Sequence, residues 1–175
     1  MKFSIVYLYT ALIVIGSAVN LVVWRKELSK RKVLETVLFW CLVTGVGLTG
    51  VTVFITLLFF PGTSVDLFGG LSGEAFRWDT GPAWLSVGLA GIACAKWRRG
   101  FWGATILISS IFLLGNAEGQ FFVLPGSGTE GPAIYSPVFW YELLLPLVMV
   151  LLWVTIWMGH RRHDIWLEPL ERKPS

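Results

Sequence analysis

The chain has 175 residues, of which 55% are hydrophobic and only 14% are charged, and its mean hydropathy is +0.69. This composition is far from that of a soluble globular domain and predicts an all-α integral membrane protein. The formal net charge is +3, but the basic residues flank apolar runs. They leave no basic face that could follow a phosphate backbone, so nucleic-acid binding is not expected.

The apolar runs predict a bundle of five transmembrane helices, over about residues 3–24, 33–60, 82–96, 101–124 and 137–159. Residues 1–160 then form a single transmembrane bundle, and residues 161–175 form a polar tail. Pro82 is expected in the first turn of the third span, where Asp79 or Thr80 can cap the helix. That span has only about 14 apolar residues, too few to cross a bilayer alone.

Lysine and arginine residues predict the orientation of the spans. Twelve of the 14 lie in three clusters at the ends of apolar runs: Arg25, Lys26, Lys30, Arg31 and Lys32; Lys96, Arg98 and Arg99; Arg161, Arg162, Arg172 and Lys173. Cytoplasmic segments carry such an excess, so we expect the N-terminus outside and the C-terminus, with its tail, inside. Aromatic residues at the span ends agree with this orientation, with Trp24, Trp97, Trp102 and Trp157 at the inner interface and Trp78, Trp84, Tyr135, Trp140 and Tyr141 at the outer.

A cleaved signal peptide is the alternative interpretation of the first span. Lys2 precedes an apolar stretch that ends in the small residues Gly16, Ser17 and Ala18. Cleavage there would leave the basic cluster of residues 25–32 outside, against the charge bias. We therefore predict a retained helix.

Cysteine and histidine residues do not suggest a metal or cofactor site. Cys41 and Cys94 lie toward the cytoplasmic ends of their spans, in a reducing compartment, so no disulfide is expected. No histidine lies in a predicted span, which excludes a membrane haem held by two histidines. His160 and His163, beside Asp164 in the tail, supply too few ligands to predict a metal site.

Polar residues inside the spans mark the candidate site, because such groups are costly in hydrocarbon and usually face the bundle or a cavity. At 100° per residue, span four carries one polar stripe made of Thr105, Ser109, Asn116 and Gln120. Glu118 points to the opposite side, and Gly115 with Gly119 forms a close-packing notch between the two faces. We therefore expect span four at the centre of the bundle.

Span five adds Glu142, one turn before Pro146, which cannot donate to the carbonyl of residue 142. Glu118 and Glu142 both lie in the outer half of their spans, and the short third span can draw Arg77 and Asp79 inward. The sequence thus predicts a polar pocket, open to the outside and lined by Arg77, Asp79, Asn116, Glu118, Gln120 and Glu142.

Helix packing is the competing explanation for these polar residues. Arg77 can simply neutralise an acid, and amides and hydroxyls can simply join helices. The same reasoning treats the small polar stripe on span two as a packing face, made of Gly45, Thr49, Thr52 and Thr56.

Several segments resemble a family of small prokaryotic multi-pass membrane proteins of unknown function: residues 76–81, 100–102 and 112–120, Pro125-Gly126, and Gly131-Pro132 with Tyr135. The family pattern has an amide and a glutamate at the places of Arg77 and Asp79, and a histidine at the place of Gln120. The resemblance implies that these segments form a shared core. It implies no activity, and a looser likeness to DoxX-type small membrane proteins is an analogy of fold alone.

Three classes of function remain. The first, which the sequence favours, is a non-catalytic protein that binds a small molecule or lipid, or that serves as an accessory subunit. The second is a proton-coupled transporter that uses Glu118 or Glu142, and the third is a membrane enzyme acting on a lipid or quinone with the same acids. The expected surroundings are the lipid bilayer of a prokaryotic cytoplasmic membrane, with a membrane-protein partner or a second copy of the chain.

Overall fold

The structure, a computed structural model, describes residues 5–25, 29–60, 74–98, 100–122 and 137–167, of which 5, 74–77, 120–122 and 160–167 are described by backbone alone. This part of the chain is all-α, as the sequence predicts, and contains no strand. Its elements are α1 (Ile5–Val23), α2 (Lys30–Trp40), the π-helix η2 (Cys41–Leu48), α3 (Thr49–Phe59), α5 (Glu74–Ala93), α6 (Gly100–Phe122) and α7 (Pro137–Leu167).

Four helical stretches of the described chain are long and apolar enough to cross a membrane: Val6–Val23, Lys30–Phe59, Gly100–Gly119 and Pro137–Gly159. The second of these joins α2, η2 and α3 into one continuous helix of 30 residues. The prediction of a helical protein suited to a membrane is therefore confirmed. The α5 helix is not apolar enough to be counted among them, because its first half is polar and includes Arg77 and Asp79.

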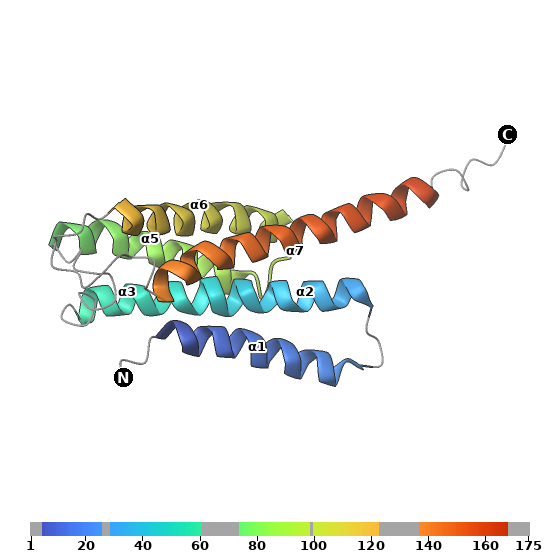
Figure 1. Cartoon of the computed structure of the whole chain (residues 1–175), viewed down its shortest axis with the longest axis horizontal. Helices are drawn as coiled ribbons and strands as arrows, with labels where there is room; N and C mark the ends of the chain where they lie inside the picture. Colours follow the sequence, from blue (N-terminus) through green and yellow to red (C-terminus); the bar gives the residue numbers. More distant parts are fainter. Residues whose placement is uncertain (1–4, 26–28, 61–73, 99, 123–136, 168–175) are drawn as a thin grey trace.

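The α2–η2–α3 helix occupies the centre of the bundle (Figure 1). Half of the residues in the most apolar stretch of this helix are buried, whereas only 17% are buried in that of α1, which packs on one side of the central helix. The α5 helix runs along η2 and α3, while α7 packs against α6 and α2. The C-terminal part of α7 extends beyond the other helices (Figure 1).

The expectation that span four lies at the centre is wrong. The α6 helix exposes a stripe of large apolar side chains, with Leu107, Ile108 and Ile111 each at least 60% exposed. A Cβ placed on Gly115 or Gly119 would have no neighbour within 4 Å among the described residues. The α6 helix therefore lies at the edge of the bundle, and the two glycines do not form a packing notch.

The polar stripe of α6 does not need helices on every side. Ser109 is buried, and its Oγ donates to the carbonyl oxygens of Thr105 and Ile106 at 2.7 and 3.3 Å, within its own helix. Glu118 is exposed near the end of the helix. A hydroxyl that donates within its own helix can lie against a single apolar neighbour. The polar stripe therefore did not require other helices on every side of α6, as the prediction assumed.

Two helices differ from their predicted bounds. The α5 helix begins at Glu74, not at Pro82, so the proline lies inside the helix and neither Asp79 nor Thr80 caps it. A cap contributes only about 1 kcal/mol, so packing of a longer helix along α3 can outweigh it. At the other end of the chain, α7 continues past residue 159 to Leu167.

Backbones approach one another most closely where α5 crosses η2 and α3. A Cβ added at Gly91 would lie 2.5 Å from the backbone nitrogen of Gly47, and one at Gly88 would lie 2.7 Å from that of Val51. A Cβ at Gly50 would in turn lie 2.7 Å from the Trp84 carbonyl oxygen. Because backbone atoms cannot swing aside as a side chain can, only glycine fits at these positions.

Gly88→Ala should therefore destabilise the bundle by about 1–3 kcal/mol, since overpacking forces the two helices apart. Gly115→Ala is the matched control in α6, where a Cβ meets open space. Alanine is the better helix former, so this control should leave stability unchanged or raise it by up to about 1 kcal/mol. Thermal unfolding of the two variants in detergent checks the prediction, and equal melting temperatures would contradict the close contact.

Candidate functional site

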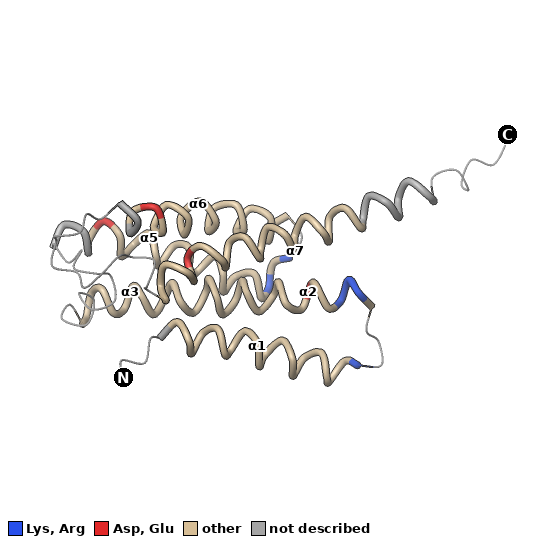
Figure 2. Tube along the Cα trace, in the orientation of Figure 1, with Lys and Arg blue, Asp and Glu red and all other residues tan. Residues whose placement is uncertain are grey.

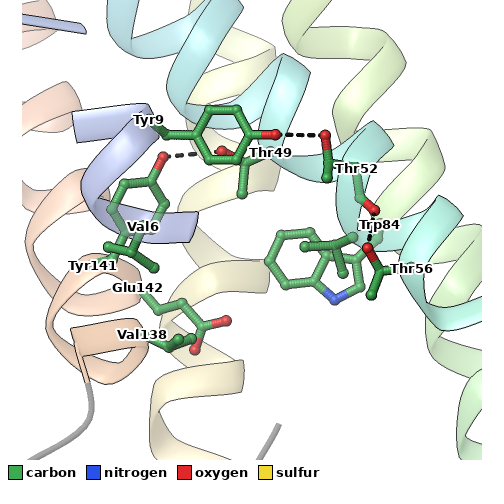
Figure 3. A pocket seen from close by; sticks show the side chains of 10 residues that line it. Val6, Tyr9, Thr49, Thr52, Thr56, Trp84, Val138, Tyr141 and Glu142 are labelled. Atoms are coloured by element: carbon green, nitrogen blue, oxygen red, sulfur yellow. Dashed lines mark hydrogen bonds between the residues drawn. The ribbon is translucent and has the colours of Figure 1, made fainter. Parts of the chain in front are cut away.

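The candidate site is a small cavity lined by residues of α1, α3, α5 and α7 (Figure 3). Its volume is about 30 Å³, which is room for about one or two water molecules. The polar lining consists of hydroxyl groups and one carboxyl group, set among valine side chains and an indole. The lining residues are Val6, Tyr9, Thr49, Thr52, Val53, Thr56, Trp84, Val138, Tyr141 and Glu142.

Glu142 is the one acidic residue that lines this cavity. Its side chain is only 1% exposed, although α7 is an apolar helix suited to a membrane. Pro146, also buried, lies inside the helix one turn later and cannot donate to the Glu142 carbonyl. The predicted meeting of an acidic side chain and a freed carbonyl therefore lies inside the bundle.

Hydroxyl groups from three helices gather on one side of the cavity (Figure 3). Tyr9 of α1 donates from its Oη to Thr52 Oγ1 of α3 at 2.5 Å. The Oη of Tyr141, on α7, lies 3.1 Å from Thr49 Oγ1 and donates to the Gly45 carbonyl oxygen at 2.8 Å. The cavity side of α1 and α7 is thus held to the central helix by hydrogen bonds.

The π-helix explains why backbone acceptors face these hydroxyls. A π-turn bonds each N–H to the fifth preceding carbonyl, and a return to α-helical pairing leaves a carbonyl without its usual donor. Thr49 Oγ1 donates to the Thr44 carbonyl oxygen at 3.3 Å, and Tyr141 Oη donates to the Gly45 carbonyl oxygen. Side-chain hydroxyls therefore supply donors at the end of η2, as an apolar bundle requires.

On α5, Trp84 forms the wall of the cavity opposite these hydroxyls. It is 4% exposed, and its ring packs edge to face on Phe112 of α6, with the ring centroids 4.9 Å apart. Figure 3 shows the indole and the Glu142 carboxyl turned toward the same space. The carboxyl, the indole and the hydroxyl groups thus line the same cavity.

Of the six residues of the predicted pocket, four have side chains that the structure describes, and these four are not gathered around this cavity. Glu142 lines it, whereas Asp79 and Glu118 are exposed and Asn116 is half-buried. The side chains of Arg77 and Gln120 lie outside the described residues. Figure 2 shows the described acidic residues on α5, α6 and α7 toward the end of the bundle away from the basic residues, with Glu35 on α2 as the exception.

Sequence reasoning missed the hydroxyl side of the cavity. One helical face of the sequence carries Thr49, Thr52 and Thr56. Hydroxyls that only pack between helices and hydroxyls that line a cavity have the same spacing, so the sequence could not tell them apart. Tyr141 is adjacent to Glu142, and its position fits an interfacial aromatic belt equally well. No local signal in the first span marks Tyr9, since its partner Thr52 is 43 residues away.

No group of three or more His, Cys, Asp or Glu side chains within the described ranges is placed to hold a metal ion. Cys41 and Cys94 are both buried in the apolar core.

Comparison with known proteins gives one match, to a family described as a family of unknown function (DUF6790), over residues 2–163. The expected resemblance to an uncharacterised family is thereby confirmed, whereas no relation to DoxX-type proteins is found. No curated protein matches the chain, and no solved structure matches it.

Tyr141→Phe should destabilise the bundle by about 1–2 kcal/mol, because it removes the donor to the Gly45 carbonyl and leaves an acceptor buried in an apolar bundle. Tyr7→Phe on α1 is the control, since Tyr7 is 56% exposed. Thermal unfolding in detergent measures both variants. A Tyr141→Phe protein as stable as the control would show that the hydroxyl does not support the π-helix.

Proposed function

The chain belongs to the DUF6790 family of unknown function, which supplies no activity, and we propose its function from the site itself. The protein is a five-span membrane protein that binds the polar group of a small molecule or lipid at Glu142 without catalysing a reaction. The observation that carries this proposal is the Glu142 carboxyl, 1% exposed beside a cavity inside the bundle.

Charge distribution supports the proposed topology. Lys and Arg residues gather at the end of α1, at the start of α2 and between α5 and α6 (Figure 2). By the positive-inside rule this end is cytoplasmic, which puts the N-terminus outside and residues 161–175 in a cytoplasmic tail of the single bundle. The α5 helix supplies the fifth span, because its 20 residues reach about 30 Å, the thickness of a bilayer core. The membrane is the cytoplasmic membrane of a prokaryote.

The apolar surface of the bundle fits a lipid environment. Three aliphatic side chains of α6, those of Leu107, Ile108 and Ile111, are at least 60% exposed, and so are those of Val22 and Val23 on α1. Such a surface is stable against lipid tails, or against another membrane protein or a second copy of this chain. An accessory role in a larger complex would use this surface and leave the cavity free for a ligand.

A buried carboxyl in a membrane bundle is the strongest indication of binding. Ionisable side chains are expensive at this depth and usually mark a functional site. Here the acid is accompanied by the hydroxyls of Tyr141 and Thr49 and by the apolar walls of Val138 and Trp84. This combination suits a ligand with a hydrogen-bonding or cationic group attached to an apolar body.

The size of the cavity limits how a ligand enters. A volume of about 30 Å³ accepts water or a single small group, so a larger molecule requires one wall to move. Of the four apolar stretches, α1 has the smallest share of buried residues. Near the cavity, a hydrogen bond from Tyr9 joins it to Thr52 of α3. Ligand entry therefore displaces α1. Arg77, Asp79, Asn116, Glu118 and Gln120, at the outer ends of α5 and α6, would form the polar approach and not the wall.

A proton-coupled transporter is the second candidate, and one observation favours it. Glu142 lines the same cavity as Tyr141 and Thr49, whose hydroxyl oxygens lie 3.1 Å apart, within hydrogen-bond distance. A carboxyl joined to hydroxyls and water can take up and release a proton. Glu118 is less suited to this role because it is exposed.

Glu142→Gln should reduce occupancy by a bound small molecule at least about tenfold, because a hydrogen bond to a charged group contributes more than one to a neutral amide. The measurement is native mass spectrometry, with an absorbance spectrum, of protein extracted gently from its own membrane. Glu118→Gln is the matched control, since it makes the same chemical change at an exposed site, and it should keep the bound molecule.

Two outcomes would contradict ligand binding at Glu142. One is wild-type protein that carries no molecule, and the other is a molecule that Glu142→Gln retains as well as Glu118→Gln does.

The transporter predicts a different result in proteoliposomes. Wild-type protein should then carry a pH-dependent flux of protons that Glu142→Gln abolishes and Glu118→Gln retains. Wild-type vesicles no more permeable than protein-free vesicles would exclude this second candidate and leave the binding function.

A further inference from the structure

A second and larger cleft lies at the opposite end of the bundle from the acidic residues of α5, α6 and α7 (Figure 2). It is formed by the last turns of α1, the first turns of α2, and the connection from α5 to α6. Its volume is about 430 Å³, within the range of about 300–1,000 Å³ typical of ligand sites. Its charged and aromatic walls are Trp24, Lys32, Glu35, Phe39, Arg98 and Trp102.

The charge of this cleft is positive. Lys32 and Arg98 face it from two elements that are far apart in the sequence. Glu35 also lines it, but its Oε1 is 2.7 Å from Nε of Arg31, so a neighbouring cation offsets its charge. Figure 2 shows further basic residues on the same segments, which raises the local positive potential.

Trp102 positions Arg98 at the wall of the cleft, and Trp24 lies at its rim. Trp102 is 7% exposed, and its Nε1 donates to the Cys94 carbonyl oxygen at 3.0 Å, which fixes the indole ring. The Arg98 guanidinium lies over that ring, 5.8 Å from its centroid. A guanidinium held over a ring by this cation–π contact keeps N–H groups that can donate to a phosphate. Trp24, by contrast, is 58% exposed at the rim, as expected of an interfacial side chain.

We propose that this cleft binds the phosphate of an anionic phospholipid from the cytoplasmic leaflet. Lys32 supplies a point charge and Arg98 a forked donor, while the lipid tails lie along the exposed apolar side chains of α1. The site is distinct from the Glu142 cavity. It requires the basic end of the bundle to lie at a membrane surface, and it does not require a ligand at Glu142.

The test titrates the full-length protein in neutral detergent with short-chain phosphatidylglycerol, phosphatidylcholine or inorganic phosphate, and measures bound molecules by native mass spectrometry. The double variant Lys32→Gln, Arg98→Gln should bind phosphatidylglycerol about 25-fold more weakly, since each basic residue near an anionic lipid contributes about fivefold. The control Lys30→Gln, Lys96→Gln removes two charges from the same end but none from the cleft wall. It should weaken binding by less than about threefold.

A folding defect would be visible as lost helicity in circular dichroism. For that case Arg98→Lys keeps the charge but loses the forked donor, and it should still weaken phosphatidylglycerol binding severalfold. If the two double variants lose phosphatidylglycerol binding equally, the lipid is held by diffuse electrostatic attraction and not by the cleft, and the proposal is overturned. Phosphatidylcholine bound as tightly as phosphatidylglycerol would also overturn the proposal. If millimolar inorganic phosphate displaces the lipid, the cleft is a site for a free anion, and the proposal of a phospholipid site is overturned.

Discussion

The backbone contact between α5 and the central helix is the constraint on which the rest of the structure depends. At Gly47, Gly50, Gly88 and Gly91 the two helices approach so closely that a methyl group on any of them would meet backbone atoms. This contact replaces side-chain interdigitation with backbone van der Waals packing, which is how helices associate when no water can be expelled. It also presses the π-helix against α5 and brings Trp84 to the wall of the Glu142 cavity.

Polar groups in the bundle are arranged so that few acceptors lie against hydrocarbon. Ser109 and Thr56 donate within their own helices, whereas Tyr141 and Tyr9 donate across helices. The first pattern is available to any hydroxyl and says little about function. The second pattern occurs around η2 and Glu142, where a distorted helix, a proline and an acid come together. Structure and candidate function therefore share the same few side chains.

The two clefts differ in the chemistry they can recognise, in keeping with their depth. The Glu142 cavity is small and lies among four helices, its polar lining is a carboxyl and several hydroxyls, and it suits a neutral or cationic group. The Lys32–Arg98 cleft is large and basic, with an exposed tryptophan at its rim, and it suits an anion at the membrane surface. The acidic residues of α5, α6 and α7 lie away from the basic end of the bundle, where Glu35 is paired with Arg31, and this separation keeps the two sites electrostatically distinct.

By itself the sequence determined that the chain is all-α and suited to a membrane, which runs are apolar, where the basic clusters lie, and that Glu142 is a candidate site residue. These properties are local, because an apolar run or a cluster of charges has the same meaning wherever the chain folds. Only the tertiary structure decided that α6 lies at the edge, that α5 begins at Glu74, and that Tyr9, Thr49 and Tyr141 accompany Glu142. The hydroxyls come together through contacts between residues 43 to 96 positions apart. A hydroxyl that lines a cavity has the same helical spacing as one that only packs, so the sequence could not distinguish the two.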